Sequence, residues 1–214
     1  MSELSQQNVD RFNQLAAEWD DSPRRTELAR AVAEAIRQAI QPNGHESVLE
    51  FGCGTGLLTA ALSSHVGRIL AVDSAEQMLE TLATKLRNLN IDNVETRLGS
   101  VPDPLPHGEF DLIVSSMTLH HVEDTAAVME SLFSRLHPGG RIALADLDAE
   151  DGSFHGDKPG IAHHGFERNA LGTLISNIGF KDIAFTDAHR MEKETDSGET
   201  QAFSVFLLSA VRPA

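Results

Sequence analysis

The chain has 214 residues, of which 41% are hydrophobic and 23% charged, as expected for one globular domain with a full core. Its net charge of −15, from 17 basic and 32 acidic residues, disfavours a nucleic-acid partner, because such partners require phosphate neutralisation. No apolar run has the length of a membrane span, and the opening MSELSQQNVDRF lacks the pattern of a secretory signal. With only one cysteine, Cys53, an internal disulfide is excluded, and we expect a cytoplasmic protein.

Two helices are predicted before the first strand. The segment FNQLAAEWD, residues 12–20, indicates a short helix. Asp21 or Ser22 can cap the next helix, whose first turn contains Pro23. That helix has apolar residues at helical spacing, namely Leu28, Val32, Ala35, Ile36 and Ile40, and it ends at residues 42–44. We interpret residues 1–44 as a helical cap on a domain formed by residues 45–214.

From residue 47 onward, strand patterns alternate with helix patterns. The predicted strands are 48–51, 68–73, 94–99, 110–116 and 141–148, and the predicted helices are 57–65, 75–89 and 125–136. The sequence HPGG at 137–140 is interpreted as a helix stop and a tight turn. Several strands are near-continuous apolar runs, which is typical of buried parallel strands. The alternation predicts a doubly wound α/β sheet.

The C-terminal part breaks this alternation. A helix around 169–178 is followed by strand patterns at 180–195 and 201–211, with a polar turn containing Ser197 and Gly198 between them. Because no helix fits between these strands, they are expected to form an antiparallel pair at one edge. The long irregular stretch at about 149–164 is interpreted as a lid-like insertion.

A glycine-rich turn follows the first strand. In VLEFGCGTGLLTAAL, residues 48–62, three glycines lie where the strand meets the next helix. Open α/β sheets bind ligands at the carboxyl ends of their strands. The spacing G-C-G-T-G departs from the dinucleotide fingerprint G-x-G-x-x-G, because Leu57 stands where the third glycine would fall. An adenosyl ligand is the other candidate, and a simple tight turn is the alternative without a ligand.

Five segments resemble the motifs of the class I S-adenosylmethionine-dependent methyltransferases, over roughly Val48 to Ile178 plus the final strand pair. They are EFGCGTG, AVDSAEQML, the end of the third strand, FDLIVSSMTLHHV and LHPGGRIALAD. The subgroup is similar to ubiquinone and menaquinone biosynthesis methyltransferases. The resemblance implies a Rossmann-like, mostly parallel seven-stranded sheet with N-terminal helices, and methyl transfer from S-adenosyl-L-methionine to a small-molecule acceptor. It also implies that Phe12 or Trp19 covers the cofactor cleft.

The resemblance implies specific cofactor contacts as well. Asp73 would accept hydrogen bonds from the ribose diol, Glu50 would lie near the amine, and Met78 would pack against the adenosine, although these could instead be cap and core residues. Ser100 stands where the family often has an acidic residue. The expected cofactor-binding residues are Glu50, Gly52, Cys53, Gly54, Asp73, Ser74, Met78, Gly99, Ser100 and Ser115.

Ten histidines are many for a chain of this length. His121, His155 and His163 are candidates for a general base, because they border the expected cleft or its lid. Structural roles are expected for His45, His65, His107, His137 and His189. A metal site is disfavoured, because adjacent histidines on a helix do not face the same way.

A second class of function remains open from the sequence. The chain could be a Rossmann-like cofactor-binding protein without methyl transfer, either a dehydrogenase or a regulator, although the glycine spacing disfavours the dehydrogenase. The acceptor, the acceptor atom and the oligomeric state are left open.

Overall fold

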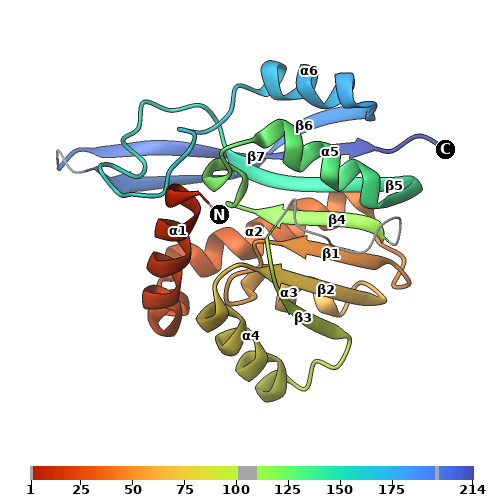
Figure 1. The fold of residues 1–214 in the computed structure, drawn as a ribbon, viewed down its shortest axis with the longest axis horizontal. Coiled ribbons are helices and arrows are strands. Elements are labelled where there is room, and N and C mark those ends of the chain that lie inside the picture. The colour runs from red at the N-terminus through yellow and green to blue at the C-terminus, as the bar shows by residue number, and fades with distance from the viewer. Residues whose placement is uncertain (1, 101–109, 196–197) are drawn as a thin grey trace.

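The computed structural model describes residues 2–100, 110–195 and 198–214, so the expectations for His107 and Ser197 lie outside the described residues. Within these ranges one sheet of seven strands has the order β3-β2-β1-β4-β5-β7-β6 (Figure 1). The strands are β1 Ser47–Phe51, β2 Arg68–Asp73, β3 Val94–Leu98, β4 Phe110–Ser116, β5 Leu136–Leu147, β6 Lys181–Glu194 and β7 Thr200–Val211. The first five strands run parallel and β7 runs antiparallel to both of its neighbours. The predicted fold class is therefore confirmed.

Helices cover both faces of the sheet (Figure 1). The described helical segments are α1 Glu3–Leu15, η1 Ala16–Asp21, α2 Pro23–Ile40, α3 Leu57–Ser63, α4 Glu76–Leu89, η2 Leu119–His121, α5 Thr125–Arg135 and α6 Arg168–Ile178. The apolar sides of α2, α3 and α4 share one core cluster with the sheet, and those of α5 and α6 share a second cluster. This burial of one helical face on each side is the general solution for a parallel sheet.

One local prediction was right only in part. Helix α5 ends at Arg135, just before HPGG, as predicted, but HPGG lies within β5, which begins at Leu136, and not before that strand. The register against β4 shifts there, and the backbone of this stretch exchanges hydrogen bonds with the chain end, with Gly139 N donating to Arg212 O at 2.8 Å. The C-terminal strands form the predicted antiparallel pair at one edge of the sheet, with β7 next to β5 and β6 outermost.

The N-terminal helix starts earlier than its apolar residues indicated. Ser2 caps α1 by accepting a hydrogen bond from Ser5 N at 3.1 Å, and the predicted 12–20 helix is divided between α1 and the 3₁₀ segment η1. The first turns of α1 are polar, so their sequence has little apolar periodicity to reveal them. In Figure 1 α1 lies at the left-hand end of the sheet. None of the described helices is both long and apolar enough to cross a bilayer.

Candidate cofactor and acceptor site

The glycine turn after β1 leaves one position open. A Cβ atom on Gly52 would lie 2.2 Å from Thr118 Cγ2, so this glycine is required for packing against the segment after β4. Gly54 also has a positive φ of +55°, but a Cβ atom there would meet no heavy atom within 4 Å. Bare backbone beside open space is what a closely bound ligand requires.

Asp73 joins the end of β2 to this turn. Its carboxylate accepts hydrogen bonds from Gly54 N and from Ala75 N, both at 2.8 Å. Burial raises the pKa of Asp73, and these backbone N–H groups oppose that shift. Each carboxylate oxygen retains acceptor capacity after one hydrogen bond. Asp73 therefore holds the turn in place, contributes to the start of α4 and can still accept hydrogen bonds from a ligand.

Glu50 is a buried acid beside the same turn. Glu50 is only 2% exposed, and its Oε2 atom has no hydrogen-bond partner among the described residues. Burial raises the pKa of Glu50 to about 8, with Asp73 adding to the shift, while Thr59 and Lys85 oppose it. A buried carboxyl without a partner is costly, and a cationic or hydrogen-bond-donating ligand group would satisfy it.

The N-terminal segment lies against the glycine turn and the start of α4. Thr55 donates its hydroxyl to Asp20 Oδ1 at 2.6 Å, and Lys85 pairs with Asp20 Oδ2 at 2.7 Å. Met78, which is 1% exposed, forms a small apolar cluster with the N-terminal segment; its other members are Ala16, Ala75, Phe12 and Trp19. The predicted roles of Met78 toward adenosine and of the two aromatic rings as a cover stay predictions.

The other expected cofactor residues contact the main chain around the turn. Cys53 is buried and its N–H donates to Val72 O at 3.1 Å, while burial raises the pKa of its thiol, which keeps it protonated. The Ser115 hydroxyl donates to Phe51 O at 2.8 Å and so joins β4 to β1. Gly99 N donates to Asp73 O at 2.9 Å. Ser74 and Ser100 directly follow Asp73 and Gly99 in the chain.

A buried histidine–aspartate pair follows β4 on the ligand side of the turn. His120 lies two residues after Thr118, whose hydroxyl donates to Gly52 O at 3.3 Å. His120 Nδ1 is 2.7 Å from Asp146 Oδ1, and both side chains are 1% exposed. Burial acts to raise the pKa of Asp146, but the charge of His120 and its hydrogen bond outweigh this and lower it. Because an ionised carboxylate only accepts hydrogen bonds, Nδ1 is the donor of this pair, and in the neutral form of the imidazole Nε2 has a lone pair.

The Nε2 atom of His120 is buried and has no hydrogen-bond partner among the described residues. The rings of His121 and His155 lie 4.2 Å and 4.8 Å from that of His120 and cover it. An oriented imidazole with a free Nε2 is the arrangement of a general base.

The three predicted bases have different surroundings. Burial, helped by the charge of His120, lowers the pKa of His121 to about 3 and that of His155 to about 2, so both are weak bases. His121 Nδ1 is 2.8 Å from Gly160 O, which fixes its ring. His163 Nε2 lies 2.9 Å from Val122 O, and His163 N donates to His120 O at 3.0 Å. Their catalytic roles stay predictions.

Sequence reasoning missed the His120–Asp146 pair. The available indication was Asp146 itself, an acidic residue inside the apolar strand RIALADLD. A buried acid there needs a partner, but the sequence does not show that the partner is the first histidine after β4. No group of three or more His, Cys, Asp or Glu side chains in the described part of the chain has the geometry of a metal site.

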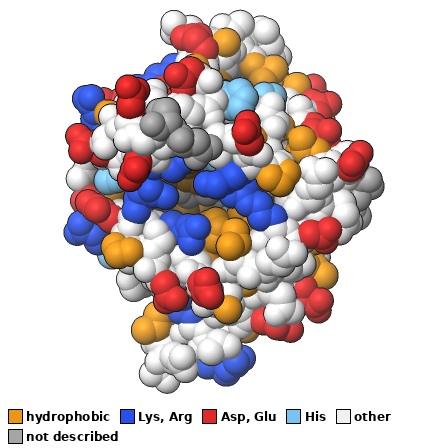
Figure 2. All heavy atoms as spheres, turned by 90° about the vertical axis from the view of Figure 1, so that its left-hand side faces the viewer, with side chains coloured by type: hydrophobic (Ala, Val, Ile, Leu, Met, Phe, Trp, Pro, Cys, Tyr) orange, Lys and Arg blue, Asp and Glu red, His pale blue; other side chains and the backbone are white. Residues whose placement is uncertain are grey.

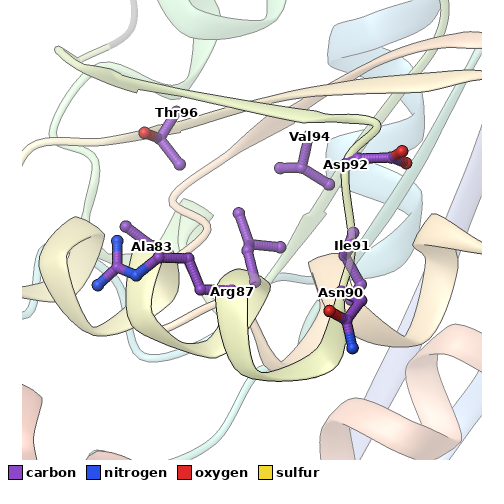
Figure 3. A pocket seen from close by; sticks show the side chains of 8 residues that line it. Ala83, Arg87, Asn90, Ile91, Asp92, Val94 and Thr96 are labelled. Atoms are coloured by element: carbon purple, nitrogen blue, oxygen red, sulfur yellow. The ribbon is translucent and has the colours of Figure 1, made fainter.

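A separate open pocket of about 580 Å³ lies between α4 and β3 (Figure 3). It is lined by Ala83, Leu86, Arg87, Asn90, Ile91, Asp92, Val94 and Thr96. These residues include none of the predicted site residues, so this pocket is distinct from the candidate site.

Comparisons with known proteins agree with this geometry. Residues 49–144 match a family described as "Methyltransferase domain". An uncharacterized methyltransferase of Schizosaccharomyces pombe is 31% identical over 153 residues, which are 64% of this chain and 54% of that protein. A ubiquinone biosynthesis O-methyltransferase of Xanthomonas axonopodis pv. citri is 29% identical over 160 residues, which are 72% of this chain and 66% of that protein.

Solved structures show the same fold. The structure of DhpI in complex with SAH has a TM-score of 0.76 at 24% identity, and the match covers 100% of this chain and 99% of that chain. The chain spans about half the length of the curated Schizosaccharomyces pombe and Mycobacterium bovis relatives that it matches. The sheet order and the solved structures show a Rossmann-like fold, and residues 49–144 are similar to a methyltransferase domain.

Proposed function

We propose that this chain binds S-adenosyl-L-methionine at the glycine turn and transfers its methyl group to a small-molecule acceptor. The observation that carries the proposal is the open position at Gly54, near the Asp73 carboxylate and the buried Glu50 carboxyl, whose Oε2 has no hydrogen-bond partner among the described residues. When bound, S-adenosylmethionine supplies an electrophilic methyl group on a positively charged sulfur. Gly54 would leave room for the part of S-adenosylmethionine that lies against the protein backbone. Asp73 would accept hydrogen bonds from the ribose hydroxyls, and Glu50 would accept one from the ammonium group.

His120 is the general base of this proposal. Nε2 of His120 would take the proton of the acceptor hydroxyl or amine, and Asp146 would stabilise the resulting imidazolium. The bond from the acceptor heteroatom to the methyl carbon would form as the methyl–sulfur bond breaks, and the sulfur would leave with the bonding electron pair as a neutral thioether. His155 covers His120 in the structure, so the segment 149–164 that carries it must move to admit the acceptor. This supports the interpretation of that segment as a lid. His121 and His155, whose lowered pKa values keep them neutral, then line the site beside His120.

The finer assignment to the ubiquinone and menaquinone subgroup is part of the same proposal. It is supported by the similarity to the ubiquinone biosynthesis O-methyltransferase. The polar lining formed by the histidines suits a polar acceptor headgroup.

Cofactor binding is tested by titrating S-adenosylhomocysteine and NAD into the protein in a calorimeter. We expect binding of the first and a rise in melting temperature, because a ligand specific to the folded state stabilises it. Asp73→Ala should lose roughly 1.5–3 kcal/mol of binding free energy, the range for hydrogen bonds to a charged group. Asp92→Ala, on an exposed loop beside the α4–β3 pocket, is the matched control. Binding of NAD alone would favour the dehydrogenase alternative, and binding of neither ligand would refute the proposal.

Base catalysis is tested once an acceptor pool gives methyl transfer. His120→Asn and Asp146→Asn should each lower turnover by about 10²-fold or more, the usual contribution of a general base, with S-adenosylhomocysteine affinity unchanged within twofold. Turnover that falls in His163→Asn but not in His120→Asn would assign the base to His163 instead.

A further inference from the structure

Basic side chains gather on one face of this acidic protein. Figure 2 shows Lys and Arg side chains around a hollow on the face that lies at the left of Figure 1, where α1 and the free end of the β6–β7 pair are found. The chain as a whole carries a net charge of −15. A local positive field on such a surface is an electrostatic feature that a ligand could use.

Three cations, on α1, α2 and β6, lie over aromatic rings. The Arg25 guanidinium lies 3.8 Å from the centre of the Trp19 ring, Arg11 lies 5.7 Å from that of Phe12, and Lys193 lies 5.0 Å from that of Phe154. We call Arg11, Arg25 and Lys193 the basic collar.

Two of these rings contact the histidine cluster. Phe12 is 5.2 Å from His121 and Phe154 is 4.7 Å from His155, while Trp19 is 5.5 Å from Phe12. Arg11 and Lys193 therefore lie one ring away from the histidine cluster, and Arg25 is connected to it through Trp19 and Phe12. After burial and the neighbouring histidines, the charges of Arg11 and Lys193 also lower the pKa of His155, which shows that their field reaches the cluster.

Two collar cations lack a counter-ion. Arg11 and Arg25 form no ion pair with a carboxylate of the described residues, and their hydrogen bonds go to the backbone oxygens of Pro159 and Trp19 at 3.3 Å and 3.0 Å. Partial burial lowers the pKa of both guanidinium groups. By contrast, Arg168 binds two carboxylates at 2.7 Å.

The nearest acid does not neutralise them. Asp20 acts on Arg25 from a distance, but its carboxylate is already engaged by Lys85 and Thr55 at 2.7 Å and 2.6 Å. Two half-desolvated guanidinium groups with several unused donors each are matched by an oxyanion, which accepts from them in pairs.

We propose that the methyl acceptor is an anionic small molecule, whose carboxylate or phosphate group binds Arg11 and Arg25 while its methylated atom reaches His120. This inference rests on the proposed function and names the substrate class of that site. The collar fixes one end of the acceptor on the α1 side of the hollow, and the histidine pair receives the proton at the other end.

The test measures binding of simple probes in the presence of saturating S-adenosylhomocysteine. Phenyl phosphate and benzoate carry the anion, and benzamide is the neutral match. We expect both anions to bind about tenfold or more tightly than benzamide, with affinity falling at high salt. Tighter binding of phenyl phosphate would indicate a phosphate-bearing acceptor, and tighter binding of benzoate a carboxylate. Equal affinity for charged and neutral probes would overturn the proposal.

Variants locate the site. Arg11→Gln and Arg25→Gln should each weaken anion binding by about tenfold, while Arg87→Gln, on the exposed side of α4, removes the same charge with less than a twofold effect. S-adenosylhomocysteine affinity should stay within twofold in all three. If the collar variants instead lose S-adenosylhomocysteine affinity and keep anion binding, the collar serves the cofactor carboxylate and the proposal is wrong. Failure of the wild type to bind S-adenosylhomocysteine would refute the proposed function without affecting the anion comparison.

Discussion

Replacing Glu50 with glutamine should make the ligand-free protein more stable at neutral pH. The folded state holds this carboxyl with a pKa of about 8, against 4.5 for an unperturbed group. Between these values the folded chain retains a proton that the unfolded chain has released. Wild-type stability therefore falls as pH rises through this window, by about 1.4 kcal/mol per pH unit from this group. Glu50→Gln has no such group and avoids that loss.

The magnitude follows from the pH interval chosen. From pH 5.5 to pH 7.5 the stability of Glu50→Gln relative to wild type should rise by up to about 2.7 kcal/mol. Urea denaturation of both proteins without ligand, at three pH values across this interval, measures the difference. The quantity compared is the change with pH of the stability difference between the two proteins. The pH-independent effect of burying an amide in place of a carboxyl cancels from this change.

The control is Glu95→Gln, because the Glu95 side chain is 73% exposed and should show no such trend. Parallel pH profiles for wild type and Glu50→Gln would refute the reasoning that Glu50 is buried without a partner.

The same variant should bind S-adenosylhomocysteine more weakly, since the amide lacks the negative charge that the ammonium group requires. Stability gained with affinity lost is the usual trade at a functional site.

Two further predictions separate packing from binding around the glycine turn. Gly52→Ala should lower the free energy of unfolding by roughly 2–4 kcal/mol, because the position has a positive φ and the new methyl group clashes with Thr118. Gly54→Ala should lower it by only about 1–2 kcal/mol. The Gly54 variant should nevertheless weaken S-adenosylhomocysteine binding by at least about tenfold. Denaturation and calorimetry on both variants decide this, and equal effects on affinity would mean that Gly54 does not face the ligand. Cys53→Ala should leave turnover within about twofold, because burial keeps its thiol protonated; a collapse of turnover with intact cofactor affinity would show thiol chemistry.

The sequence predicted the sheet because its information there is local. The apolar runs of β1, β2 and β4, and the alternation with helices, are visible residue by residue, and their predicted bounds differ from the observed ones by at most one residue. The HPGG stretch was misread because its conformation depends on Arg212, which pairs with it from the far end of the chain.

The site was predictable only in part, for the same reason. The glycine turn and Asp73 are close in sequence to recognisable motifs, so their neighbourhood could be predicted. The His120–Asp146 pair joins residues 26 positions apart, and the Arg11–Pro159 contact joins residues 148 positions apart. Neither leaves a periodic pattern, so both become visible only when the chain is folded.

The way α1 is held has a consequence for the timing of turnover. Asn8 is its one buried residue, and the half-buried Phe12 is its apolar contact with the Met78 cluster and His121. Its other contacts include Ser2 with Glu123, Asn8 against Gly160 and Arg11 with Pro159. A helix with so little buried apolar surface opens locally at a free energy well below that of global unfolding. Because α1 contacts the segment that covers His120, its detachment would free that segment as well. Under the proposed function, α1 (Glu3–Leu15) would then control the rate of product release and not that of the methyl transfer.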